Sequence, residues 1–513
     1  MKKILFILLI ITPILAHSRS DLIVVYPSQY IEFDFHAANS TTEAQLFTAL
    51  YEGLFNLNPR TMRPQPAAAE RYTVSEDGLT YTFFIRQGLA FSDGSPLNAH
   101  SFYHSFLRLL NPAADHLTAA KLDVIEGAKA YRLGEAGLDG LAIKVVDNHE
   151  LQLTLNEVTP HFTALLTHHA FSPISGRQLP MLWDEPARIA FSGPYTITTI
   201  TEDSIIMERN PFYRAPGEVL TARIIVRFSD DRERIAADFN RFLVDWVMPG
   251  SFDPNLILER GALQINAMFA TTYYFFASDN PLFSNTALRQ ALVQAIPTNE
   301  LRANQIIRAE SLVPAIQNYP RVRGINHNAR AAANALRRLG FRNGANLPEL
   351  TIATFSENDS NAVAIKEAWQ ALGLTVSIIT PAPSQDYLAF IAESNPTLAL
   401  MSWVGDFLDP MAFLQLFTSQ NPLNFSSFKS AAYDDLLRLA NHQSGNERLN
   451  TLADAERLLI AGGYVIPIAH PPSINLINPQ AVAGWYANPL NIYPFAGLRL
   501  APLPGMPALP VSF

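Results

Sequence analysis

Hydrophobic positions along the chain follow two patterns, which are short apolar runs and longer stretches with helical spacing. The short runs are rich in β-branched and aromatic residues and predict strands, and Asp77-Gly78 between two of them predicts a hairpin turn. The predicted strands cover residues 21–26, 81–85, 141–146, 151–155, 224–226, 350–355, 375–379, 397–401 and 465–468, with a further pair inside 193–214.

The helical stretches are framed by capping residues. Asn98 and Asn285 precede two of them and carry the side-chain oxygen of an N-cap, and Gly340 follows another as a C-cap glycine. In the second half of the chain strands and helices alternate, which favours a parallel β-α-β arrangement. The predicted helices cover residues 41–53, 99–110, 287–296, 329–339, 361–372, 432–439 and 449–459.

Length and composition indicate a large globular α/β protein. With 513 residues the chain exceeds what one hydrophobic core usually supports, so two or three domains are expected. No repeat or low-complexity linker divides it, and we therefore expect discontinuous domains. The net charge of −9 and the pI near 5.8 argue against a nucleic-acid partner, which would need a basic surface.

The first residues carry the features of an export signal. Lys2 and Lys3 precede an apolar run, Ile4–Leu15, and Ala16-His17-Ser18 forms a small-x-small cleavage site. The run is shorter than the roughly 20 residues of a spanning helix, which argues against a membrane anchor. We predict a signal peptide at 1–18 and a soluble periplasmic protein. Because the sequence has no cysteine, we expect no disulfide and no lipid attachment at a cysteine.

One stretch, SWVGDFLDP at 402–410, raises a question of chemistry. An apolar strand leads into it, and Asp406 follows Trp403 at the end of that strand. A carboxylate at this place either caps a local turn or faces a cleft where it meets a cation. Asp409 precedes a proline and has the position of a turn or helix-cap residue.

Enzyme signatures are absent from the sequence. We find no G-x-S-x-G elbow, no H-E-x-x-H pair, no Walker loop and no G-x-G-x-x-G loop. Positions 161, 165 and 168 would share one helix face, but position 165 is leucine, so the histidines of HFTALLTHH make a poor metal site. We expect no catalytic residues, no cofactor and no metal.

A set of segments in a fixed order resembles the solute-binding proteins of peptide ABC importers. The segments, which span almost the whole chain after the signal, are EGLFNLNP, RYTVSEDGLTYTFFIRQGLAFSDGSPLNAHSFYHSF, GPYTI with MERNPFYR, TTYYFFASDN, NTALRQAL, SWVGDFLDP and NFSSFKSAAYDDLL. The resemblance is to family 5, the oligopeptide- and dipeptide-binding proteins. It implies a bilobal periplasmic-binding-protein fold (type II, cluster C) with an extra subdomain inserted near the N-terminus.

The resemblance also implies how the chain is divided. Lobe I would comprise residues 21–51, 189–285 and 479–513. The inserted subdomain would be 52–188 and lobe II 286–478. A peptide would bind between the lobes, which would then close over it.

The same resemblance implies the site residues. In relatives with a W-x-x-D segment the aspartate holds the peptide amino terminus, and here this segment is Trp403 to Asp406. The backbone of Ser402 and Val404 would pair with the peptide, opposite a lobe I segment. Aromatic pocket walls are implied near the cleft. The further residues implied are Asn39, Ser40 and Thr41 on lobe I, and Tyr387, Trp403, Tyr273 and Tyr274 as aromatic walls.

One departure from the family concerns the ligand carboxylate. Some oligopeptide binders carry an arginine three residues before the tryptophan, but this chain has Leu400 there. We expect a monomeric peptide-binding protein that serves an ABC permease. Two alternatives remain open, which are the same fold binding a murein fragment, sugar or metal chelate, and an exported hydrolase.

Overall fold

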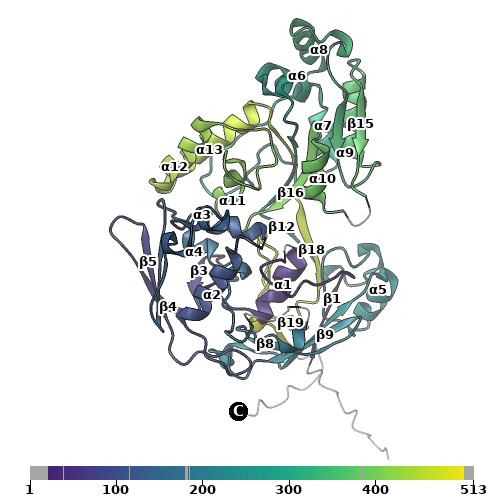
Figure 1. Cartoon of the computed structure of the whole chain (residues 1–513). Helices are drawn as coiled ribbons and strands as arrows, with labels where there is room; N and C mark the ends of the chain where they lie inside the picture. Colours follow the sequence, from purple (N-terminus) through teal and green to yellow (C-terminus); the bar gives the residue numbers. More distant parts are fainter. Residues whose placement is uncertain are drawn as a thin grey trace, which may run out of the picture.

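The computed structural model of the chain has two lobes, each built around its own mixed sheet (Figure 1). It describes residues 21–501 except 39, 115, 179–182, 184, 383 and 384. The predicted signal peptide and the proline-rich end from residue 502 lie outside the described residues. Within the described ranges, no helix has the length and apolar character needed to cross a membrane.

The first sheet is built around β1 (Asp21–Tyr26), which is covered on both faces. Leu22 and Val24 pack into one core with helix α1 (Thr41–Leu50), and Val25 packs into another with helix α5 (Arg232–Asn240). Burial on both faces explains why the strand is a continuous apolar run. The strand order is β12, β18, β11, β1, β10, β9, β8, with bounds Leu263–Ala267, Pro472–Ile477, Trp246–Val247, Asp21–Tyr26, Arg223–Phe228, Ser204–Arg209 and Tyr195–Ile200.

The second sheet confirms the predicted β-α-β arrangement. β14 runs parallel to both β15 and β16, and helices α9 and α10 form the crossovers. β13 runs antiparallel to β16 and β17, so the sheet is mixed. The order is β15, β14, β16, β13, β17, with bounds Val376–Ile379, Leu350–Ala353, Leu398–Val404, Ala270–Phe276 and Val465–Ala469, and the two helices are Ser360–Gln370 and Tyr387–Ser394.

Helices cover both faces of this second sheet. α6, α8 and α9 pack on one face, where Tyr274 and Leu400 point, and α11, α12 and α13 pack on the other, where Tyr273 points. This division follows from the alternation of side chains along each strand. The bounds of α6, α8, α11, α12 and α13 are Thr286–Ala295, Ala329–Arg338, Met411–Leu414, Ala431–Asn441 and Gly445–Ala461.

The chain crosses between the two sheets earlier than the predicted boundaries at 285 and 478. β13 pairs with β16 and β17, although the prediction assigned it to lobe I. β18 pairs with β11 and β12, although the prediction assigned it to lobe II. Sheet membership puts the crossings at 268–269 and 470–471. The predicted boundaries came from the family resemblance, which does not fix the sheet to which a strand belongs, and each crossing lies one strand earlier in the chain.

A third, four-stranded sheet lies within the segment predicted as an inserted subdomain. Helix α2 (Ala99–Leu109) packs on it through Phe102 and Phe106. The apolar core of this unit continues into the second lobe, where it reaches Phe413. The strand order is β4, β5, β7, β6, with bounds Ala69–Val74, Thr80–Ile85, Glu150–Thr154 and Ile143–Asp147.

The predicted caps are confirmed. Asn98 and Asn285 accept hydrogen bonds from backbone N–H groups of the first turns of α2 and α6. Gly340, just after α8, has a φ of +89°, the left-handed conformation that favours glycine. The remaining short elements are β2 (Phe55–Leu57), β3 (Pro64–Pro66), β19 (Val482–Ala483), β20 (Arg499–Leu500), α3 (Ala128–Arg132), α4 (Phe162–Leu165) and α7 (Thr298–Ala303).

Candidate functional site

Strand β16 extends beyond its parallel neighbour β14. Of the residues of β16, β14 pairs only with Leu398 and Ala399 in the described part of the chain. The Tyr387 hydroxyl donates to the Ala353 carbonyl at 3.1 Å and also contacts the backbone of Leu400, the next residue of β16. Beyond this point, in the described part of the chain, β16 is paired with β13 alone. A strand with one unpaired edge presents N–H and C=O groups to which an extended peptide can add as a further strand. The edge includes the predicted residues Ser402 and Val404.

The chain turns sharply where β16 ends, and Gly405 makes the turn possible. The Gly405 N–H donates to the Phe269 carbonyl at 2.8 Å. A Cβ at this position would lie 2.6 Å from a ring carbon of Phe269, closer than real contacts allow. The glycine between Val404 and Asp406 therefore fixes the direction in which the aspartate leaves the strand.

Asp406 forms an ion pair with Lys121, which lies in the 3₁₀ turn Leu117–Leu122 of the inserted segment. Both side chains are largely buried, with 15% of Asp406 and 10% of Lys121 exposed. The Lys121 ammonium also lies 5.8 Å from the centre of the Trp403 ring. The carboxylate at the end of β16 thus faces a cation across a contact between two parts of the fold. Nothing in the sequence pointed to Lys121.

Asp409 has the structural role that its position predicted. It accepts a hydrogen bond from the Met411 N–H at 2.9 Å, at the start of α11. Arg448 donates to both of its carboxylate oxygens, at 2.6 and 2.9 Å. The two aspartates of the stretch therefore have different roles: Asp409 is paired with Arg448 of its own lobe, and Asp406 is paired with Lys121 of the inserted segment.

The side chains of β16 alternate between two environments. Trp403 packs against the core shared with the inserted segment and donates its indole N–H to the Ala412 carbonyl at 3.0 Å. Leu400 is buried on the opposite face and lies across from Tyr274. The position where some relatives carry an arginine is therefore part of a hydrophobic core in this chain.

The four predicted aromatic wall residues separate into two groups. Tyr387 and Trp403 are partly exposed beside β16, and Tyr387 stacks on Phe355 with ring centres 4.1 Å apart. Tyr273 and Tyr274 are buried, with 3% and 0% exposed. They belong to the two cores on either face of the sheet, so we do not retain them as ligand contacts.

The predicted lobe I segment lies at the start of α1. Ser40 is the N-cap of this helix and forms a capping box with Glu43, and Thr41 is the first helical residue. Asn39 lies outside the described residues. His169 forms a hydrogen bond with the backbone of nearby Ala38 and interacts electrostatically with both members of the Lys121 pair. The end of β16 and the start of α1 therefore approach the same histidine.

The histidines of the segment 161–169 do not share one helix face, because α4 covers only Phe162–Leu165. Burial lowers the pKa of His168 to about 3 and of His169 well below its ordinary value, so both rings are neutral near pH 7. His168 accepts a hydrogen bond from the Ala170 N–H through Nδ1. Over the ranges that the structure describes, no group of three or more potential ligands could hold a metal ion.

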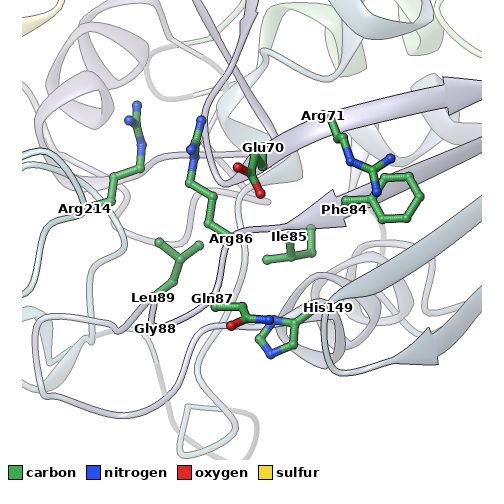
Figure 2. Close-up of a pocket in the computed structure, with 10 residues that line it drawn as sticks. All are labelled: Glu70, Arg71, Phe84, Ile85, Arg86, Gln87, Gly88, Leu89, His149 and Arg214. Carbon is green, nitrogen blue, oxygen red and sulfur yellow. The ribbon is translucent and has the colours of Figure 1, made fainter.

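A cavity of about 610 Å³ lies where the inserted segment meets Arg214, and its lining residues do not include Asp406. Figure 2 shows that the guanidinium groups of Arg71 and Arg86 point in different directions. Arg71 lies over the Phe84 ring, Arg86 donates to the Ala67 carbonyl, and Arg214 is paired with Glu52. Because these cations serve separate partners, they do not converge on one ligand position.

A second cavity, of about 430 Å³, runs along the contact between the inserted segment and helices α11 and α12. Lys121 forms part of its wall, together with Glu157 and Asp434. Asp406 does not line this cavity either, but its ion-pair partner Lys121 does.

His161 gives a testable pH dependence at this contact. Its ring stacks on Phe407 with the ring centres 5.0 Å apart. Burial lowers the pKa of His161 from 6.5 to about 4; the charge of Asp409 opposes this shift, and the charge of Arg448 adds to it. The folded protein resists protonating this ring, so its contribution to stability is complete above pH 6.5 and is lost as the pH falls toward 4. The loss amounts to about 3 kcal/mol.

We therefore expect thermal unfolding scans to show a lower Tm at pH 4 than at pH 7, with a smaller decrease in His161→Phe. Phenylalanine preserves the stacking and cannot be protonated, and the buried Nδ1 of His161 has no hydrogen-bond partner among the described residues. His100→Phe, at an exposed histidine, is the control and should behave like the wild type. An equal decrease in wild type and His161→Phe would contradict the prediction.

Two sheets joined by a double crossing, with an additional subdomain and an open strand edge, define a bilobal solute-binding protein. The family model of bacterial extracellular solute-binding proteins, family 5, matches residues 63–425, and the chain belongs to this family.

Individual relatives cover most of the chain. The oligopeptide-binding protein OppA of Bacillus subtilis is 25% identical over 461 residues, 84% of each chain. The probable deoxycholate-binding periplasmic protein YgiS of Escherichia coli is 25% identical over 496 residues, 88% of this chain and 90% of its own. Among solved structures, Haemophilus influenzae OppA in complex with RPPGFSPFR matches with a TM-score of 0.80, at 20% identity, over 94% of this chain and 99% of its own. This structural match supports the fold.

Proposed function

We propose that this protein captures peptides between its two lobes and delivers them to an ABC importer. The observation that carries the proposal is the free edge of β16, which ends at Asp406. Membership of the solute-binding family and the peptide-binding relatives support it. The proposed site consists of the backbone of Ser402 and Val404, the side chain of Asp406, and Trp403 and Tyr387 as walls.

The chemistry of this site suits ligands of varied sequence. Main-chain pairing along β16 suits extended peptides of varied sequence, because every residue except proline offers the same N–H and C=O groups. A carboxylate at the end of the strand gives one ligand terminus a counter-charge. The opposite wall would come from lobe I, at Asn39, Ser40 and Thr41. These features give affinity without requiring particular ligand side chains.

The proposed working cycle involves binding and release without covalent chemistry. The open form takes up ligand, and the closed form presents it to the permease. We propose that the protein works outside the cytoplasmic membrane as a monomer. The carboxylate of a bound peptide would interact with a group other than residue 400, since Leu400 is buried and uncharged.

A non-peptide ligand is the second candidate. It is favoured by the observation that Asp406 is already paired and that residue 400 carries no charge. One curated relative is a probable deoxycholate-binding protein. A ligand without a free amino group would not require Asp406.

Native mass spectrometry of the protein as purified, combined with calorimetric titration of tri-alanine and penta-alanine, tests the two candidates. We expect a mixture of co-purified short peptides and saturable binding of at least one of the two alanine peptides. A single defined non-peptide mass with no peptide binding would contradict the proposal and support the alternative. Conversion of added peptide into products would indicate a hydrolase.

A further inference from the structure

We propose that Lys121 is an intramolecular competitor for the ligand's amino terminus. Its ammonium occupies the position at Asp406 where, on the proposed function, the α-ammonium of a peptide would bind. The inference rests on that proposed function and adds a residue that controls affinity and selectivity. Lys121 lies 285 positions from Asp406 in the sequence, on a different part of the fold.

The ion pair is built as a closed contact. Lys121 is 10% exposed and Asp406 is 15% exposed, and the Trp403 ring lies 5.8 Å from the ammonium. Within the described ranges, the hydrogen bonds of the Lys121 ammonium and of the Asp406 carboxylate go only to each other. The aliphatic part of Lys121 and the ring of Trp403 thus shield the pair from water.

The site cannot keep Lys121 and accept a second ammonium at little cost. One carboxylate with two ammonium groups has an excess positive charge, and uncompensated charge is costly in a largely buried place. The neighbouring His168 and His169 are neutral near pH 7, so they do not change this charge balance. A ligand with a free amino terminus must therefore displace Lys121.

The structure offers space for the displaced side chain. Lys121 lines the cavity of about 430 Å³ described above, whose wall holds the acidic residues Glu157 and Asp434 together with the basic residues Lys129 and Arg438. A rotated Lys121 side chain can place its ammonium in this cavity, where acidic groups and solvent replace Asp406. Asp123 lines the cavity too, but it is paired with Arg132.

Competition of this kind has a calculable effect. If only a fraction of molecules has Asp406 free, the apparent Kd rises by the inverse of that fraction. A pair formed in about nine molecules of ten therefore weakens ligand binding about tenfold. Removing Lys121 should therefore increase the affinity for ligands with a free amino terminus by about the same factor, and should not increase the affinity for N-acetylated ligands.

Calorimetric titration of the full chain with tri-alanine, penta-alanine and their N-acetylated forms tests the proposal. In Lys121→Met we expect at least about tenfold tighter binding of the free peptides. Lys129→Met is the matched control, because Lys129 lines the same cavity but, among the residues that the structure describes, its ammonium donates only to the Gln420 amide oxygen, at 3.5 Å. The affinity of Lys129→Met for the free peptides should remain within about twofold of the wild-type affinity.

The outcomes separate the inference from the proposed function. Unchanged or weaker peptide binding in Lys121→Met, with peptide binding by the wild type, would overturn the role of Lys121 and leave the peptide function intact. Equal tightening for free and acetylated peptides would also overturn it. Absence of peptide binding in both wild type and Lys121→Met would overturn the proposed function and the inference with it.

A second measurement uses the unaltered protein and so does not depend on the stability of a variant. A brief pulse of acetic anhydride, kept well below the peptide concentration so that most ligand amino groups stay free, labels accessible lysine side chains after they lose a proton, and mass spectrometry locates the label. We expect little labelling of Lys121 in the free protein and increased labelling when penta-alanine or tri-alanine is bound. Labelling that stays the same or decreases with bound peptide would contradict displacement.

Discussion

Replacing Asp406 by alanine is expected to weaken the binding of peptides with a free amino terminus by at least about 30-fold. Removing one partner of a largely desolvated charge pair costs about 2–5 kcal/mol. The variant also leaves the Lys121 ammonium beside the site, where it repels a second positive charge. Isothermal titration of the wild type and variant with the same free peptide measures the effect.

Asp123→Ala provides the matched control for Asp406→Ala. Asp123 lies on the inserted segment and, like Asp406, is ion-paired: its partner is Arg132, and 19% of its side chain is exposed. Its removal should leave peptide affinity nearly unchanged. If Asp406→Ala binds free peptides as tightly as the wild type does, the carboxylate has no role at the ligand terminus.

Replacing Gly193 by alanine is expected to reduce the free energy of unfolding by about 3 kcal/mol or more, because overpacking against backbone cannot relax easily. Gly193 lies against the end of α1, where its N–H donates to the Leu50 carbonyl at 2.9 Å. A Cβ would lie 2.5 Å from the carbonyl carbon of Leu50 and 2.6 Å from the nitrogen of Tyr51. Urea denaturation followed by circular dichroism measures the change.

Gly217→Ala is the control for this substitution. A Cβ at Gly217 would meet nothing within 4 Å. Its backbone is outside the left-handed region, so alanine should be neutral or slightly stabilising. Equal stability of Gly193→Ala and Gly217→Ala would show that the α1 contact adjusts more readily than its geometry implies.

Local signals predicted the elements of the fold well. β1 was expected at residues 21–26 and is found there, and the Asn98 and Asn285 caps were visible because a cap depends on neighbours within one turn. The assignment of strands to sheets was less accurate. β13 has an aromatic, buried sequence that fits either sheet, and its partners β16 and β17 lie far along the chain, so the crossing at 268–269 was misplaced.

The candidate site was predictable only on one side. Trp403, Gly405 and Asp406 form a contiguous pattern, so the sequence indicated a carboxylate at a strand end. The partner Lys121 was not predictable, because nothing in a lone surface-type residue 285 positions away marks it as a contact of Asp406. Tyr273 and Tyr274 were misjudged because aromatic residues in a strand have the same pattern whether they line a cleft or fill a core.

The double crossing between the lobes has a mechanical consequence. β12 and β18 pair with each other on one side of it, and β13 and β17 pair on the other. His470 Nδ1 contacts the Ala270 carbonyl at 3.1 Å and the Thr271 hydroxyl at 3.0 Å, which ties the second connecting segment to the start of β13, directly after the first. Two tethered strands bend about one axis far more easily than they twist about each other. Such torsional stiffness would return the β16 edge to the same alignment with the first lobe after each opening.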